Sequence, residues 1–240
     1  MRLALIATAL VGLCWLFPSQ AGAQTVIVTG QGPVIGNGRL VSQERPITAV
    51  TVLDLNGAFE LTIVVGQPPH LTLTGEENIL PTIKTSISDD RLSVFSDRSY
   101  TASRAIRVTV AVPHLTSLET SGSNRIEGRN IDGDELSVSL SGSNSAALVG
   151  KVAALIARLD GSNRLSAAQL IADSVNIRVA GSGDASLDAQ EHIAAEIFGS
   201  GSITVHGNPK DRRTQVNGSG KITFPPEDPH KKQAVRDGRQ

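Results

Sequence analysis

The chain has 240 residues, of which 40% are apolar, and its 22 Lys and Arg side chains nearly balance 23 Asp and Glu side chains. A net charge of −1 without a basic cluster argues against a nucleic-acid partner. The single Cys, Cys14, excludes a disulfide framework within the chain and a cysteine metal site.

Residues 1–23 have the three parts of a secretory signal peptide. Arg2 supplies the charged start, an apolar run extends from Leu3 to Phe17, and a small-residue A-x-A site ends at Ala23. The run is shorter than the roughly 20 residues that a bilayer span needs, so a retained anchor helix is the weaker alternative. We expect cleavage after Ala23, which exports the mature chain to the periplasm or the cell surface and leaves no integral membrane segment.

The residues that follow predict extended structure. Residues 24–46 carry scattered Gly, Pro and Gln, and we expect an extended lead-in in which Val26–Val28 is the only strand-like piece. Residues 47–113 contain short runs of alternating apolar and polar residues without helical periodicity. They predict irregular first coils, or a β cap, at the amino-terminal end of the repeats described next. The predicted strands are Ile47–Leu53, Phe59–Val65, Leu71–Leu73, Leu92–Phe95 and Ile106–Val112.

Residues 115–224 contain a Gly-Ser pair six times, at spacings of 20, 19, 20, 18 and 19 residues. A fixed period near 20 residues is typical of a solenoid, in which each repeat is one coil stacked on the next. Gly readily adopts positive φ, so we expect each pair to form a corner between two strands. The corner residues are Gly122, Ser123, Gly142, Ser143, Gly161, Ser162, Gly181, Ser182, Gly199, Ser200, Gly218 and Ser219.

Apolar residues alternate with polar ones on both sides of each corner. Positions two and four before the Gly, and four and six after it, are mostly apolar, whereas positions three before and three after are mostly polar. This is the period of a half-buried strand and not of a helix. Each coil is predicted as two strands that meet at the Gly, plus a less regular third segment such as Ile131–Asp134. The expected fold is therefore all-β, a parallel β-solenoid (β-helix) with an irregular β cap at its amino-terminal end.

Asn follows the Gly-Ser pair in the first three coils, at Asn124, Asn144 and Asn163, and Gly takes its place in the next three. Asn is the non-Gly residue that best tolerates left-handed backbone, so we expect the exchange to have a backbone cause. The Ser column would chain hydroxyl hydrogen bonds along the stack. We interpret this Ser/Asn ladder as a structural corner motif; a repetitive binding strip is the alternative.

The chain ends in residues 225–240, which are rich in Pro and charge and have no apolar face. A segment that cannot bury apolar surface stays disordered, so we predict a disordered tail. The expected organisation is a signal peptide over 1–23, a lead-in over 24–46, one solenoid domain over 47–224 and this tail.

Several short motifs, taken in order, resemble a known family. They are Phe59-Glu60-Leu61-Thr62-Ile63 before Gly66, Gly75-Glu76-Glu77-Asn78, Ile106-x-Val108, Pro113-x-Leu115 and the Ser-Gly-Ser repeats from Ser121. Together they resemble the head GIN domain, an auto-transporter adhesin family of unassigned function, over about residues 47–224. The resemblance implies a parallel β-solenoid exported by bacteria. It offers no catalytic residues.

Parallel β-helices also host polysaccharide lyases and hydrolases, and the fold alone does not decide between binding and catalysis. Glycoside hydrolysis needs two carboxyl groups about 5 to 10 Å apart. Asp160 and Asp184 lie beside corners of adjacent coils and are the best candidates for such a pair, although Asp is also a common solvated turn residue. The other candidate carboxylates are Asp132, Asp134, Glu135, Asp89 and Asp90.

Candidate contact residues lie in the outward columns. Arg158 and Arg178 should stack as like charges, with Glu196 on the next coil, and form either a solvated ladder or a strip for an anionic ligand. Phe198 precedes Gly199 in an outward column and is either an exposed contact or a residue covered by the carboxyl-terminal tail. No metal or cofactor is expected, because the five His residues share no ligand spacing. They are His70, His114, His192, His206 and His230.

The leading hypothesis is an exported, non-enzymatic β-solenoid of bacteria that acts as an adhesin-like interaction module. Its expected partner is a protein or glycan of the cell envelope, with nucleic acid excluded. The alternative is a β-helical lyase or hydrolase acting on envelope or extracellular glycans.

Overall fold

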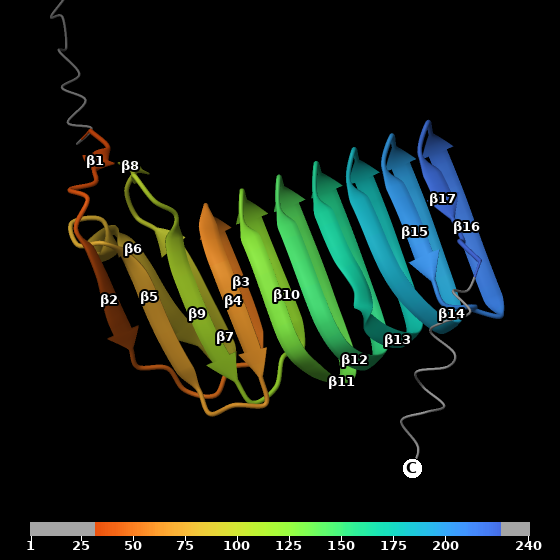
Figure 1. Cartoon of the computed structure of the whole chain (residues 1–240), viewed down its shortest axis with the longest axis horizontal. Coiled ribbons are helices and arrows are strands. Elements are labelled where there is room, and N and C mark those ends of the chain that lie inside the picture. The colour runs from red at the N-terminus through yellow and green to blue at the C-terminus, as the bar shows by residue number, and fades with distance from the viewer. Residues whose placement is uncertain (1–31, 227–240) are drawn as a thin grey trace, which may run out of the picture. The chain divides into compact units, whose positions relative to one another are not determined.

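The structure, a computed structural model, describes residues 32–226, and these form a parallel β-solenoid of about five turns (Figure 1). The predicted fold class is confirmed. The predicted signal peptide with its cleavage after Ala23, the strand-like piece Val26–Val28 and residues 227–240 of the predicted tail lie outside the described residues.

Within residues 32–226, seventeen strands and one short 3-10 helix follow one another. They are β1 (Val34–Ile35), β2 (Leu40–Arg45), β3 (Val52–Gly57), β4 (Phe59–Val65), β5 (His70–Glu76), η1 (Leu80–Thr82), β6 (Ile83–Ser88), β7 (Arg91–Ser96), β8 (Tyr100–Thr101), β9 (Ile106–Val112), β10 (Ser117–Gly122), β11 (Arg125–Gly142), β12 (Ser145–Gly161), β13 (Arg164–Gly181), β14 (Asp184–Gly199), β15 (Ser202–His206), β16 (Asp211–Gly218) and β17 (Lys221–Thr223).

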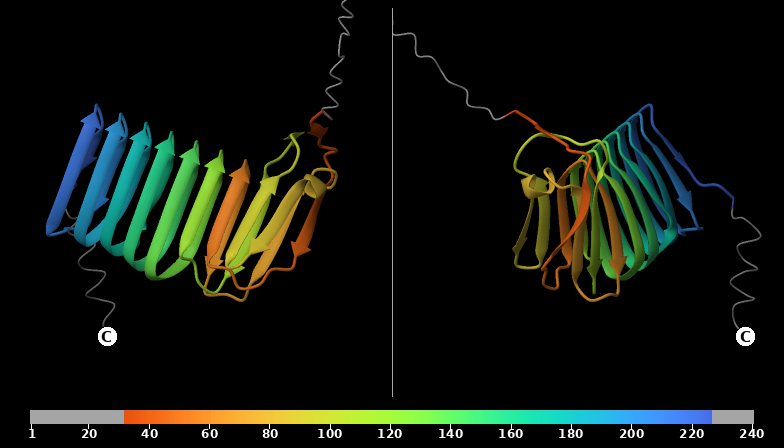
Figure 2. Two further views of the ribbon diagram at one scale, coloured as in Figure 1. Left: turned by 180° about the vertical axis from the view of Figure 1, so that it is seen from behind. Right: turned by 60° about the vertical axis from the view of Figure 1, so that its left-hand side comes forward.

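The regular coils stack with the corner glycines in register. Gly122 pairs with Gly142, Gly142 with Gly161, Gly161 with Gly181, and the series continues through Gly199 to Gly218. All six glycines have positive φ, from 102° to 133°. A Cβ at Gly142 would lie 2.4 Å from the Gly122 carbonyl oxygen, so close stacking also requires Gly. Figure 2 shows the corners aligned along one edge of the stack.

Alternation along the strands builds the core. Leu140, Leu159, Val179 and Ile197, which precede their glycines by two positions, are fully buried. Each such side chain contributes about 1.5 to 3 kcal/mol by leaving water. The same column ends at Val216, which is 41% exposed because no further coil among the described residues covers it.

One coil that carries no Gly-Ser pair precedes the regular ones in space. β3 and β4 meet at Gly57, which is in register with Gly122, and both strands pair with their counterparts in the first regular coil. On their other side they pair in parallel with β7 and β9. The β3–β4 coil is therefore enclosed between two coils that come later in the sequence.

The sequence predicted either irregular first coils or a β cap at this end of the solenoid, and antiparallel strands form a cap here. β5 pairs antiparallel with β9, β2 with β5, and β6 with β7. The expected extended lead-in over 24–46 is corrected for its described part, residues 32–46, because Leu40–Arg45 forms strand β2 of this cap. Arg45 fixes it, since its guanidinium donates hydrogen bonds to the carbonyls of Ile83 at 2.7 Å and Leu80 at 3.2 Å.

The expected backbone role of the corner asparagines is wrong. Among the described non-glycine residues only Asp89 and Asn130 have positive φ. Asn124, Asn144 and Asn163 are instead buried, and their side chains form a hydrogen-bonded ladder along the stack. Asn144 Oδ1 accepts from both the backbone N–H and the Nδ2 of Asn124, at 2.9 Å each.

The ladder stops at Gly183, the first position of the column that carries Gly in place of Asn. A Cβ at Gly183 would lie 3.0 Å from the carbonyl oxygen of Asn163, and one at Gly201 would lie 2.4 Å from the carbonyl oxygen of Gly183. The coils therefore pack tightly at this position beyond the ladder, and at Gly201 a side chain has no space. The Ser hydroxyls do not form the expected continuous chain, because among the Gly-Ser serines only Ser123 bonds along the stack, at 3.5 Å to the Ser143 carbonyl.

Candidate functional site

The outward column three positions before the corners places the predicted arginines side by side. Arg158 is in register with Arg178, and Arg178 with Glu196 on the next coil. The Arg178 guanidinium lies 4.0 Å from the Glu196 carboxylate and 4.3 Å from the centre of the Phe198 ring. The exposed ion pair contributes under about 1 kcal/mol. We call Arg158, Arg178 and Phe198 the arginine strip.

The two candidate catalytic carboxylates do not share a ladder. Asp160 precedes its corner and is in register with Ser141 and Ala180. Asp184 follows its corner, is in register with Arg164, and lies 3.7 Å from the guanidinium of that residue. Each side chain is exposed. The corner therefore separates the two groups, which belong to strands on its opposite sides.

The remaining candidates are scattered over the solenoid. Asp132 is in register with Lys151, Asp134 and Glu135 are exposed nearby, Asp89 forms the turn between β6 and β7, and Asp90 accepts a hydrogen bond from Thr51 at 2.6 Å. Within residues 32–226, no three His, Cys, Asp or Glu side chains gather as a metal site would require. His192 lies 3.7 Å from Asp211, and His206 lies 3.1 Å from the Ser186 hydroxyl.

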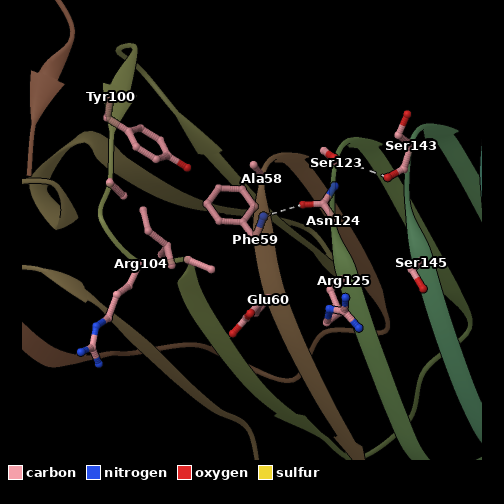
Figure 3. A pocket seen from close by; sticks show the side chains of 13 residues that line it. Ala58, Phe59, Glu60, Tyr100, Arg104, Ser123, Asn124, Arg125, Ser143 and Ser145 are labelled. Carbon is pink, nitrogen blue, oxygen red and sulfur yellow. Dashed lines mark hydrogen bonds between the residues drawn. The ribbon is translucent and has the colours of Figure 1, made fainter.

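A cavity of about 450 Å³ lies at the amino-terminal end of the regular stack (Figure 3). We call it the corner cavity. It opens between the segment around β8 and the corners of the first three coils. Its lining consists of Ala58, Phe59, Glu60, Tyr100, Ala102, Arg104, Ala105, Ile106, Ser123, Asn124, Arg125, Ser143 and Ser145.

The start of the Asn ladder forms the inner side of the corner cavity. Phe59 occupies the Asn position of the β3–β4 coil, because Glu60 is in register with Arg125, and its backbone N–H donates to Asn124 Oδ1 at 3.0 Å. Ala58 occupies the Ser position and carries no hydroxyl. The serine column along the corners therefore begins only at Ser123.

The opposite side is formed by residues 97–105, which interrupt the coil made by β7 and β9. Tyr100 is half-buried, and burial raises the pKa of its hydroxyl. Figure 3 shows its ring directed from β8 toward Phe59.

Glu76 anchors this segment. Its carboxylate accepts hydrogen bonds from the Ser103 hydroxyl and the Ser103 N–H, at 2.6 Å each, and from the Gly38 N–H at 2.9 Å. The Ser103 hydroxyl hydrogen bond, followed by those backbone hydrogen bonds, holds the pKa of Glu76 below its usual value.

The cavity has a positive balance of charge. Arg104 and Arg125 line it, and both side chains are exposed. Within the described part of the chain, neither guanidinium has a carboxylate within ion-pair distance. The lining carboxylate, Glu60, is paired with Arg107 at 3.2 Å. Figure 3 shows Arg104 and Arg125 on either side of Glu60.

The corner cavity was missed in the sequence because it lies where the repeat is broken. Tyr100 and Arg104 belong to a segment that matches no other coil. One signal was available. Residues 53–63 read Leu, Leu, Gly, Leu and Ile at the same column spacings as the later coils, which would have identified Gly57 as a corner and Ala58 and Phe59 as its variant residues.

Comparison with known proteins adds information on family and fold. No protein of curated function matches the chain in sequence. The crystal structure of a putative adhesin from Bacteroides fragilis superposes with a TM-score of 0.61 at 19% identity, over 79% of this chain and 98% of that one. A putative adhesin from Parabacteroides merdae gives 0.51 at 19% identity, over 80% and 99%. At this identity the likeness is one of fold.

Within residues 32–226 no helix is long and apolar enough to cross a membrane. The family described as "Putative auto-transporter adhesin, head GIN domain" matches residues 50–209, which begin two residues before β3 and end three residues after β15. Because the match covers well over half of the sequence, this chain belongs to that head GIN domain family.

Proposed function

We propose that this protein is a non-enzymatic binding module of adhesin type, which is exported and acts at the bacterial envelope or cell surface. The observation that carries the proposal is the unbroken register of the corners from Gly57 to Gly218. A backbone held in this way presents exposed side chains at fixed spacings on a rigid surface. Such pre-organisation lowers the entropy cost of binding.

Three observations support a surface role. The family and two solved structures of the same fold carry the description adhesin. Residues 1–23 have the composition of an export signal. Exposed Arg and Ser side chains and the half-buried Phe198 occupy outward columns of the coils, where a glycan or protein of the envelope has access to them.

The placement of the carboxylates favours binding over glycan cleavage. Hydrolysis of a glycosidic bond requires two carboxyl groups that converge on one bond. Asp160 and Asp184 belong to different ladders, and Asp184 is engaged by Arg164. The lyase or hydrolase alternative therefore has no assembled pair of these two groups to support it.

Binding and turnover are separated by one experiment on residues 24–240. We expect the purified protein to be retained on envelope preparations and on a glycan array, and to release no reducing sugar from any retained glycan. The double variant Arg158→Ala/Arg178→Ala tests the arginine strip against Arg164→Ala, an exposed arginine of another ladder. Turnover of a glycan, or retention on neither material, would overturn the proposal. If the double variant is retained as well as the unaltered protein, only the role of the arginine strip is excluded, and the proposed function stands.

A further inference from the structure

The corner cavity lies where the repeat of the solenoid is interrupted. Two arginines that have no partner carboxylate among the described residues, Arg104 and Arg125, line it. From this we propose that it binds a short segment of an acidic polysaccharide, a chain of pyranose rings that carry carboxylate groups. The inference rests on the proposed function, because it names a ligand class and a site for the binding module.

The charges select an anion. Guanidinium groups bind carboxylates through paired, charge-assisted hydrogen bonds of fixed geometry. Arg104 and Arg125 line the cavity without a partner carboxylate among the described residues, and Arg107 neutralises Glu60 between them. Because the two arginines lie on either side of Glu60, they suit a ligand that carries more than one carboxylate (Figure 3).

The other lining groups select a sugar over a simple anion. A sugar ring has an apolar C–H face and a polar edge of hydroxyl groups. The Tyr100 ring is half-exposed at one side of the cavity, and the hydroxyls of Ser123, Ser143 and Ser145 lie on the other. Serine hydroxyls both donate and accept hydrogen bonds, as sugar hydroxyls require.

The size of the cavity and its position agree with this ligand. Its volume of about 450 Å³ falls within the range of about 300 to 1,000 Å³ that is usual for small-molecule sites. Ala58 lacks the hydroxymethyl group that Ser123 and Ser143 carry at the equivalent corner position. Ala58, Ser123 and Ser143 stand at the corners of three successive coils, so the lining of the cavity follows the row of corners, along which a bound chain molecule can continue.

The test measures binding of tetragalacturonate and tetramannuronate to residues 24–240 by calorimetry, with cellotetraose as the neutral control and inorganic phosphate as the anion control. We expect Arg104→Ala and Arg125→Ala each to weaken uronate binding about tenfold or more, because each removes a charge-assisted contact. Ala58→Trp should abolish binding by filling the cavity while leaving both arginines in place. Arg164→Ala, in the ladder of Arg125 but two coils away, should bind as the unaltered protein does.

Each outcome decides the inference. Loss in the three cavity variants with an unchanged melting temperature, and no loss in Arg164→Ala, supports it. Absence of uronate binding to the unaltered protein, equal binding by the cavity variants, or binding of phosphate as tight as that of the uronates overturns it. If the protein still binds envelope preparations in those cases, the proposed function stands without this site. If the protein binds neither the uronates nor envelope preparations, both the further inference and the proposed function are wrong.

Discussion

At the scale of single residues, the corner asparagines show how one side chain replaces a missing backbone partner. The chain turns at each Gly, and the N–H two residues later has no strand partner on the next coil. Asn144 supplies that partner to Asn124 through Oδ1, and its own Nδ2 donates to the Ser141 carbonyl at 2.7 Å and to Asn163 Oδ1 at 2.9 Å. The Asn144 amide therefore forms hydrogen bonds within its own coil and with both neighbouring coils.

Asn144→Ala should lower the free energy of unfolding by about 2 to 4 kcal/mol, because it leaves buried donors of Asn124 without an acceptor. The measurement is chemical denaturation followed by circular dichroism. Asn176→Ala is the matched control, since Asn176 is an exposed residue of the same type in β13, and it should change the value by under about 0.5 kcal/mol. Equal losses in both variants would contradict the structural role of the ladder.

At the scale of elements, the segment that carries β8 depends on one buried carboxylate. Glu76, at the end of β5, is 1% exposed and holds Ser103 and Gly38, which come from opposite ends of the cap sequence. Since the hydrogen bonds to the charged form lower its pKa, the carboxylate stabilises the folded protein above the pKa of the unfolded chain. That contribution is lost as the pH falls through the lower pKa of the folded state.

Acid titration tests this anchor. The melting temperature of the unaltered protein should fall as the pH drops from the ordinary Glu pKa of 4.5 toward and below the lowered value. Glu76→Gln should have a lower melting temperature at pH 7. Its melting temperature should also fall less on acidification, because it lacks the carboxylate that is protonated there. Glu77→Gln, which removes an exposed partner of Arg39, should keep the unaltered pH profile. Parallel profiles for the unaltered protein and Glu76→Gln would refute the role of the carboxylate.

The sequence was sufficient for those elements that repeat themselves. Gly-Ser spacing and alternation predicted the regular coils, and short alternating runs located β4, β7 and β9 before them. The same reasoning gave the wrong role to the asparagines that follow the Gly-Ser pairs. Asn at a corner is compatible with either left-handed backbone or side-chain hydrogen bonds, and the sequence alone does not distinguish the two. The same reasoning also missed the place of the β3–β4 coil in the stack. The column spacing around Gly57 marks a corner, but it does not show that this coil pairs with two coils that come later in the sequence.

The candidate site was less accessible to prediction than the fold. Arg158 and Arg178 could be placed in one ladder, because column positions follow from the period. The corner cavity requires knowing that Tyr100 and Arg104 lie over Ala58 and Ser123, and that contact depends on the path of an irregular segment. No spacing in the sequence encodes such a path.

At the scale of the whole molecule, stability is a sum over coils with unequal neighbours. An interior coil is covered on both sides, whereas the last described one is covered on one side only. Val179 and Val216 occupy the same column, yet the first is fully buried and the second is 41% exposed.

These two valines offer a direct measurement of that difference. Val179→Ala should cost about 2 to 3 kcal/mol in unfolding free energy, because it leaves a cavity between packed coils. Val216→Ala should cost under about 0.5 kcal/mol. Denaturant titration of both variants gives the comparison, and a large loss at Val216 would reveal that another part of the chain or a second molecule covers the last coil.

The register of the corners also has a mechanical consequence. The hydrogen bonds of the regular coils run along the solenoid axis, from each coil to the next. Tension applied to the carboxyl-terminal end therefore strains one coil boundary at a time, and each released coil of 18 to 20 residues adds about 60 Å of chain. The enclosed β3–β4 coil cannot peel before its neighbours do. A pulled molecule would lengthen stepwise from its last coil while the corner cavity, at the far end, keeps its shape under load.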